Sequence, residues 1–217
     1  MKKQFWIERW QLNEIGFHQD NINTYLESWW QKLNTIPGTQ VFVPLCGKSR
    51  DMLWLLGQGY KVLAVEVSSL AVENFFSEND LEPVIKNQGE FVSYEINDLT
   101  ILCGDIFSIT KNDLKEVTAV YDRASLVALP PEMRKQYSDH LMAILPAESE
   151  TLLITLEYCQ KEMNGPPFSV TEKEVCDLYA ERFQVEALSE HDILDESPRF
   201  KKRGLTRFIE KVYRLSR

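Results

Sequence analysis

Apolar residues in this chain form short continuous runs that alternate with segments of helical periodicity. A short apolar run bounded by turn signals is typical of a buried strand, whereas apolar residues that recur every three or four positions are typical of a helix. This pattern predicts strands at 40–45, 61–68, 99–107, 119–129 (ending in a loop) and 150–158. It predicts helices between and after them at 50–59, 70–79, 130–145 and 171–183.

The alternation of apolar strands with helices predicts an α/β fold, a doubly wound and mostly parallel sheet covered on both faces. Two further strands are predicted at 184–189 and 206–215. Little sequence between them can serve as a helical crossover, so we expect them to be an antiparallel pair at one edge of the sheet. In sheets of this kind ligands bind beyond the carboxyl ends of the strands.

The first 35 residues lie outside the alternation. Two helices are predicted there, one around Phe5, Trp6 and Trp10 and a second at 22–33. We expect residues 1–35 to form a helical cap at one end of the sheet and residues 36–217 to form the sheet core. The whole chain, 1–217, is then one domain, in keeping with its length.

Composition narrows the class of protein. The formal net charge of −9 argues against nucleic-acid binding, which depends on Lys and Arg. No apolar run is long enough to span a bilayer, and no apolar signal core follows the first residues, so we expect a cytoplasmic protein without membrane contact. The four cysteines are widely spaced with no C-x-x-C pair, which indicates reduced thiols and no metal site. We expect a monomer.

The stretch "VFVPLCGKSRDM", residues 41–52, has the form of a strand, a turn and a helix. A phosphate-binding loop would need another glycine at position 42, where Phe42 stands, and a dinucleotide fingerprint needs more glycines than Gly47 alone. A pyrophosphate site is therefore disfavoured. A smaller anion such as a carboxylate can still bind the free N–H groups of the helix that begins near Ser49.

Two acidic residues follow neighbouring strands. Glu66 ends its strand nineteen residues after Gly47, where a carboxylate can accept hydrogen bonds from both hydroxyls of a ribose. Asp105 can accept from an adenine amino group beside an apolar wall at Ile106. Glu66 as a solvated strand-end carboxylate and Asp105 as a turn residue remain alternatives. Together with the 41–52 loop, these two residues favour a ligand that is a nucleoside and carries a carboxylate. S-adenosylmethionine matches that description better than NAD does.

Arg123 lies at the end of the fourth strand, directly after Asp122. It either faces the cleft and steers an anionic group or pairs with Asp122. Trp10 and Phe17 can close over a ligand, and an aromatic face attracts a cation such as a sulfonium by about 0.5–2 kcal/mol. Ordinary packing of the first helix is the alternative.

Four blocks carry a resemblance to a known family: "FWIERWQLNEIGFHQ", "VFVPLCGKSRDMLWLLGQGYKVLAVEVS", "CGDIF" and "YDRASLVALPPEMR". They resemble the bacterial thiopurine S-methyltransferases, from about residue 5 to the "FIEKVY" near the C-terminus. The resemblance implies a Rossmann-like class I methyltransferase fold, S-adenosylmethionine as methyl donor, and thiopurines or other aromatic and heterocyclic thiols as acceptors. Some bacterial members act on selenium or tellurium compounds.

Carried over by position, the resemblance implies a set of site residues. The donor site consists of Trp10, Leu45, Glu66 and Arg123, surrounded by Trp6, Phe17, Asp105 and Ile106. The acceptor is expected to contact Phe17, Arg123 and Arg199, with Arg203 as the substitute if Arg199 does not face the acceptor.

Methyl transfer from a sulfonium requires a soft nucleophile held in line with the methyl carbon. A thiolate is the reactive form of a thiol, and aromatic thiols are acidic enough to need no dedicated general base. Arg123 is the candidate catalytic residue because its charge favours an anionic acceptor, and His18 is expected to be a hydrogen-bonding loop residue. Methyl transfer to another small acceptor, such as a halide or a metalloid oxyanion, and donor binding without turnover remain alternatives.

Overall fold

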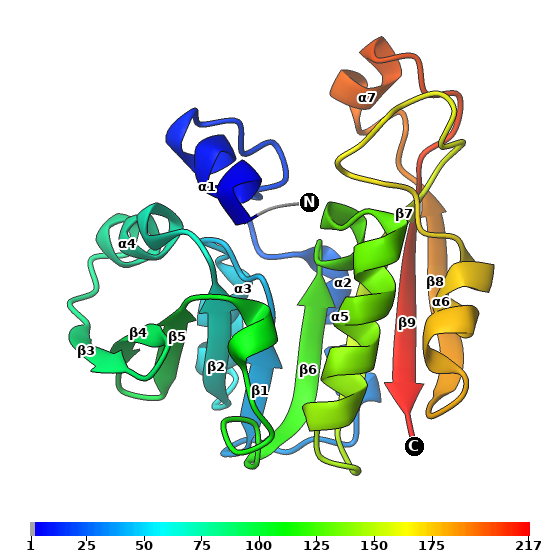
Figure 1. Ribbon diagram of the computed structural model, residues 1–217. Helices are drawn as coiled ribbons and strands as arrows, with labels where there is room; N and C mark the ends of the chain where they lie inside the picture. The colour runs from blue at the N-terminus through cyan, green and yellow to red at the C-terminus, as the bar shows by residue number, and fades with distance from the viewer. Residues whose placement is uncertain (1–2) are drawn as a thin grey trace.

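The computed structural model describes residues 3–217 and is built on one nine-stranded sheet with helices on both faces (Figure 1). The strand order is β3-β4-β5-β2-β1-β6-β7-β9-β8. Five central neighbours are parallel, which confirms the predicted doubly wound sheet. They are β5 (Leu99–Cys103), β2 (Lys61–Glu66), β1 (Gln40–Val43), β6 (Val117–Arg123) and β7 (Glu150–Glu157).

The C-terminal strands pair antiparallel, as predicted. They are β8 (Gln184–Asp192) and β9 (Ile209–Ser216). Within the sheet β9 lies between β7 and β8 and runs antiparallel to both. Because of this direction, the first residues of β9 lie beside the carboxyl end of β7, with Glu210 opposite Leu156. The connection between β8 and β9 contains a short helix, α7 (Pro198–Lys202), that the sequence did not predict.

The other edge of the sheet is an antiparallel hairpin that was also not predicted. It consists of β3 (Val84–Gln88) and β4 (Phe91–Ile96), which pairs with β5. All five residues of β3 are exposed, so the strand lacks the apolar run that marks a buried one. The turn contains Gly89 at a φ of 60°, which glycine adopts without strain.

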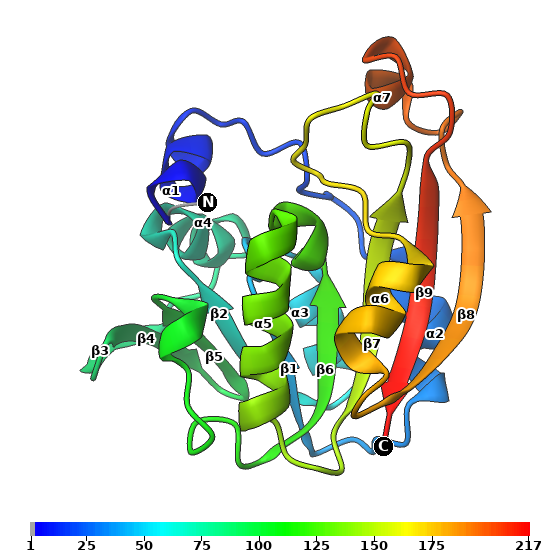
Figure 2. The same cartoon turned by 45° about the vertical axis from the view of Figure 1, so that its right-hand side comes forward.

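Alternating side chains of the central strands contribute to two separate cores. In β1, Phe42 packs with the core under one set of helices, and Val41 and Val43 pack with the core on the opposite face. The first face is covered by α5 (Pro131–Ile144) and α6 (Glu172–Tyr179), and Figure 2 shows both lying along the strands. The second is covered by α2 (Thr24–Trp29), α3 (Asp51–Gly57) and α4 (Ser69–Glu78).

The N-terminal segment divides between two positions. Helix α1 (Lys3–Gln11) lies beyond the carboxyl ends of the strands, where a cap was expected (Figures 1 and 2). Helix α2 and the 3-10 turn η1 (Trp30–Lys32) instead pack on a face of the sheet, because Leu26, Trp30 and Leu33 are buried in its core. Only the first part of the expected cap therefore lies over the end of the sheet. No helix within residues 3–217 is long and apolar enough to cross a bilayer.

Candidate active site

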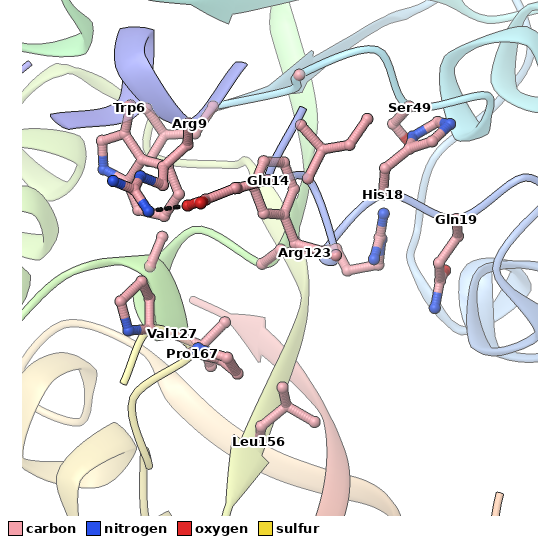
Figure 3. A pocket seen from close by; sticks show the side chains of 18 of the residues that line it. Trp6, Arg9, Glu14, His18, Gln19, Ser49, Arg123, Val127, Leu156 and Pro167 are labelled. Carbon is pink, nitrogen blue, oxygen red and sulfur yellow. Dashed lines mark hydrogen bonds and ion pairs between the residues drawn. The ribbon is translucent and has the colours of Figure 1, made fainter. Parts of the chain in front are cut away.

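A cavity of about 1040 Å³ lies at the carboxyl end of the sheet, beneath α1. Its walls come from α1 and the loop after it, from the ends of β1, β2, β6 and β7, from the 165–167 loop, and from the segment between β8 and β9. Figure 3 shows side chains from α1 and the loop after it, from β6 and β7, and from the 165–167 loop around one space, with Arg123 among them. Such a volume is slightly above the usual range for small-molecule sites, about 300–1,000 Å³.

At one end of the cavity, the carboxylate of Glu66 is held by backbone groups. One oxygen accepts from the N–H of Gly47 at 2.9 Å and the other from the N–H of Ser68 at 2.8 Å. Burial raises the pKa of Glu66, and these N–H donors partly offset that shift. Each carboxylate oxygen has more than one lone pair, so a carboxylate fixed in this way can still accept from a ligand hydroxyl.

Gly47 has two reasons to be glycine. Its φ is 54°, in the left-handed region, and a Cβ there would lie 3.0 Å from Cζ2 of Trp10. Trp10 therefore packs directly on the turn beside Glu66, and it is 5% exposed. Phe17 packs edge-on against Trp10 and Trp6, with ring centroids 5.4 and 5.7 Å apart, so the three predicted aromatic residues form one wall.

Three residues in the cavity wall have a positive φ without being glycine. They are Asn13, after α1, with a φ of 54°, Leu45, after β1, with a φ of 47°, and Ala124, after β6, with a φ of 65°. Such conformations cost about 1–3 kcal/mol each and are frequent at ligand sites. The chain therefore turns sharply at the ends of two adjacent strands, and Leu45, a predicted donor residue, lies at one of these turns.

Arg123 pairs with Asp51 rather than with Asp122. Its Nε lies 3.2 Å from Oδ2 of Asp51, which also accepts from the hydroxyl of Tyr121 at 2.9 Å. The alternative of an Arg123–Asp122 pair is therefore wrong, because adjacent strand residues point to opposite faces. Asp122 instead accepts from the hydroxyl of Tyr137 at 2.8 Å.

Asp51 is a site residue that the sequence did not reveal. It is 1% exposed, lies in the first turn of α3 and accepts from the backbone N–H of Asn23 at 2.8 Å. Its negative charge lies near the helix N-terminus, where an anion was expected to bind. A buried aspartate beside a helix start looks from sequence like a capping residue, so the only signal was its position two residues after Ser49.

At the other end of the cavity is Glu210, which the sequence prediction also missed. It lies on β9, is half-buried and lines the cavity. Its pKa is raised to about 7: burial is the largest cause, Arg123 and a hydrogen bond from Tyr25 oppose the rise, and Glu196 adds to it. In the sequence Glu210 is one of several charged residues in an ordinary strand pattern, so no signal in the sequence marked it.

Arg199 and Arg203 both line the cavity from the α7 segment. The guanidinium of Arg199 occupies the space where a side chain on Gly16 would lie, since a Cβ there would be 1.3 Å from its Nη1. Both arginines lie near the ring of Phe200, at 5.6 and 6.0 Å. The contact with Gly16 means that the loop after α1 meets the α7 segment across the mouth of the cavity.

Asp105 and Ile106 are not part of the cavity wall. Asp105 caps the 3-10 turn η2 (Ile106–Ser108) by accepting from the N–H of Phe107, and it pairs with Lys3 at 2.7 Å. Ile106 is 5% exposed and belongs to the core under α5. Their expected contacts with adenine stay a prediction.

Further polar side chains of the cavity wall come from α1 and the loop after it. Arg9 and Glu14 form an ion pair within the wall, marked by the dashed line in Figure 3. His18 also lines the cavity; burial and the charge of Lys48 lower its pKa, so its ring is neutral at neutral pH. Nε2 of His18 lies 3.6 Å from Oδ1 of Asp20. Across residues 3–217 no group of three or more potential ligand side chains can hold a metal ion.

Comparison with solved structures identifies the class of fold. The chain is similar to a 1,6-didemethyltoxoflavin-N1-methyltransferase from Burkholderia thailandensis, with a TM-score of 0.61 and 15% identity over 99% of this chain and 87% of that one. It is also similar to an S-adenosylmethionine-dependent methyltransferase from Methanosarcina mazei, with a TM-score of 0.63 and 13% identity over 91% and 98% of the two chains. The fold is that of the class I methyltransferases.

Comparison with sequences identifies the family within that class. A family model described as thiopurine S-methyltransferase matches residues 1–217. A thiopurine S-methyltransferase from Nitrosospira multiformis is 52% identical over 99% of this chain and 98% of its own length. One from Azotobacter vinelandii is 48% identical over the full length of both. The chain belongs to the thiopurine S-methyltransferase family, as the sequence motifs indicated.

Proposed function

We propose that this protein transfers the methyl group of S-adenosylmethionine to the sulfur of thiopurines and other aromatic or heterocyclic thiols. The observation that carries this proposal is one cavity that has a buried carboxylate, Glu66, at one end and two groups of opposite charge, Arg123 and Glu210, at the other. It has room for a donor and a flat acceptor together. Family membership supports the same reaction.

The residues at the Glu66 end suit the donor. The carboxylate of Glu66, fixed by two backbone N–H groups, is placed to accept from ribose hydroxyls. Trp10 and Phe17 offer aromatic faces to the sulfonium, and Leu45 supplies an apolar contact at the sharp turn after β1. Asp105 and Ile106 are proposed to contact the adenine when the donor is bound, next to Glu66 at the adjacent strand end.

The residues at the other end suit the acceptor. Leu156 and Pro167 provide apolar surface, and Arg123 provides a fixed positive charge because Asp51 orients its guanidinium. A thiolate placed there lies between Arg123 and the methyl group of the donor. The enzyme lowers the barrier chiefly by holding sulfur, methyl carbon and leaving thioether in line. Arg199 or Arg203 is proposed to cover the acceptor from α7.

We place the reaction in the cytoplasm, with a small molecule as the only partner and a monomer as the working form. All four cysteines are free, which supports a reducing compartment. The net charge of −9 supports the absence of a nucleic-acid partner. We treat residues 1–217 as one catalytic domain, with residues 1–35 as its N-terminal part.

An acceptor screen with methyl-labelled S-adenosylmethionine tests this function. The purified protein is incubated with 6-mercaptopurine, thiophenols, a selenol, iodide and tellurite, and labelled product is measured. We expect the thiols to be methylated with the highest kcat/KM. Activity on iodide or tellurite alone would assign another small acceptor, and tight binding of S-adenosylhomocysteine without any product would assign a donor-binding role.

A further inference from the structure

The acceptor end of the cavity holds a carboxylate that the reaction as described does not use. We infer that Glu210 is the group that takes the proton from a thiol or thione acceptor while its sulfur is methylated. This inference rests on the proposed function and adds a catalytic residue to it. Many heterocyclic thiols carry their proton at neutral pH, on sulfur or on a ring nitrogen, and so need a proton acceptor before or during transfer.

Position in the sheet places Glu210 at the acceptor end. The donor end is formed by the ends of β1 and β2, with Gly47 and Glu66. Moving along the strand order, β6 contributes Arg123, β7 contributes Leu156, and β9 contributes Glu210 directly opposite Leu156. Figure 3 shows Arg123 and Leu156, which border this region of the cavity. An acceptor that lies beyond the donor's methyl group is therefore beside Glu210.

The other carboxylates of the cavity wall are already engaged. Across the described residues the wall contains three carboxylates, those of Glu14, Glu66 and Glu210. Glu14 is paired with Arg9, and both oxygens of Glu66 accept from backbone N–H groups at the donor end. No salt bridge within residues 3–217 includes Glu210, whereas a hydrogen bond from Tyr25 orients it.

The surroundings of Glu210 favour proton transfer near neutral pH. Arg123 on β6 and Tyr25 on α2 stabilise its ionised form, and Glu196 before α7 opposes ionisation. On the neighbouring strands, Leu156 of β7 and His191 of β8 lie opposite it. Burial brings its pKa to about 7, and a general base works best when its pKa is close to the working pH.

The step balances without a further reactant. The acceptor's proton moves from sulfur or ring nitrogen to a carboxylate oxygen of Glu210, and the electron pair it leaves flows to the acceptor sulfur. That sulfur forms a bond to the methyl carbon as the bond from the methyl carbon to the donor's sulfonium breaks. The electron pair of the broken bond stays on the donor sulfur, which becomes the neutral thioether of S-adenosylhomocysteine. Glu210 then returns its proton to water.

The test compares Glu210→Gln with wild type on two acceptors. The first is 6-mercaptopurine, which is protonated at neutral pH, and the second is 4-nitrothiophenol, which is a thiolate throughout the range measured. We expect Glu210→Gln to lower kcat/KM for 6-mercaptopurine by about 100-fold or more, the scale of general-base catalysis. For 4-nitrothiophenol we expect less than about a threefold change, because no proton has to be removed.

The pH profile provides a second readout. In wild type, kcat/KM for 6-mercaptopurine should fall as pH drops through about 7, because Glu210 becomes protonated and cannot accept. Glu210→Gln should replace this limb with one that follows the ionisation of 6-mercaptopurine itself, because without Glu210 only the ionised acceptor can react. Glu196→Gln should move the limb to lower pH, since the charge of Glu196 raises the pKa of Glu210. Glu186→Gln, a carboxylate on β8 that pairs with Arg214, is the matched control and should match wild type on both acceptors.

Calorimetry with S-adenosylhomocysteine shows that each variant is folded and binds the donor product. Equal losses on the two acceptors, no loss on either, or an unchanged acid limb in Glu210→Gln would overturn the assignment. Loss of the limb in His18→Gln but not in Glu210→Gln would also overturn it, in favour of His18. A wild-type protein that methylates no thiol would overturn the proposed function itself, which is a distinguishable result.

Discussion

At the donor end of the cavity the polar group is satisfied by nearby backbone, whereas at the acceptor end polar groups are satisfied by side chains from distant segments. Glu66 accepts from the N–H groups of Gly47 and Ser68 on the turns that follow β1 and β2. Arg123 depends on Asp51, which is 72 residues away, and Glu210 interacts with Tyr25 from α2. Because backbone N–H groups hold Glu66, its carboxylate has one fixed position. Because side chains surround Arg123 and Glu210, substitutions in those side chains can change the charge at the acceptor end.

The donor end should therefore be the more sensitive to single changes, and Glu66 is its centre. Glu66→Ala removes the proposed ribose acceptor and leaves two buried N–H groups without a partner. We expect donor binding to weaken by about 2–3 kcal/mol, the scale for hydrogen bonds to a charged group. Calorimetry with S-adenosylhomocysteine measures this change in the free energy of binding. An unchanged dissociation constant in a folded variant would falsify the role of Glu66 and remove the contrast between the ends.

The next largest effect is expected at Gly47. In Gly47→Ala the alanine must keep the left-handed backbone conformation of Gly47. Its new Cβ lies only 3.0 Å from Cζ2 of Trp10. We expect a loss of about 2 kcal/mol in the free energy of unfolding, made up of backbone strain and overpacking. Gly89→Ala is a matched control: its φ is 60° and nothing lies within 4 Å of its Cβ. It should lose only about 1 kcal/mol from strain.

Urea unfolding of the two alanine variants isolates the contribution of Trp10. Equal losses at Gly47 and Gly89 would mean that Trp10 moves aside at no cost. The aromatic wall would then be loosely held, and the donor end would be as adaptable as the acceptor end.

At the acceptor end, Arg123→Lys tests whether the planar guanidinium is needed. A lysine keeps the charge but cannot reproduce the geometry that Asp51 imposes on the fork. We expect kcat/KM for an aromatic thiol to drop by roughly tenfold, about 1.4 kcal/mol, with a larger drop for acceptors of greater negative charge. Steady-state kinetics across several thiols measures it. Activity within about twofold of wild type on all of them would assign Arg123 a structural role.

The smallest effect is expected at the mouth of the cavity. Gly16→Ala would displace the guanidinium of Arg199, the flexible end of an exposed side chain, so stability should hardly change. We expect KM for the acceptor to rise by about threefold, roughly 0.7 kcal/mol, with donor binding unchanged. Gly57→Ala, where nothing lies within 4 Å of the new Cβ, is the control. A larger change in donor binding than in acceptor KM would show that the contact belongs to the donor end.

Local signals made the parallel sheet and the placement of Gly47 and Glu66 at its carboxyl end predictable. The buried strands are apolar runs, Gly47 lies in the turn after β1, and Glu66 is the last residue of β2. The hairpin of β3 and β4 was missed because β3 is wholly exposed and takes its place only by pairing with β4. Helix α7 was missed because its five residues gain their contacts from the tertiary structure.

The acceptor end was only partly predictable for a related reason. Arg123 was found from its place at the end of a predicted strand and Arg199 through the family resemblance. The partner of Arg123 was not found, because no spacing links it to Asp51 across 72 residues. Glu210 lies within an ordinary strand pattern. Its significance arises from burial beside Arg123 and Glu196, which only the folded chain brings together.

The hydrogen bond from the backbone of Asn23 to Asp51 also bears on how the protein can be engineered. The same carboxylate holds Arg123 through its other oxygen, so the start of α2 and Arg123 share one anchor. If Arg123 contacts the acceptor as proposed, we expect a truncation or fusion that disturbs residue 23 to change acceptor selectivity through Asp51. Variant libraries aimed at new acceptors can therefore include the α1–α2 connection as well as the cavity wall.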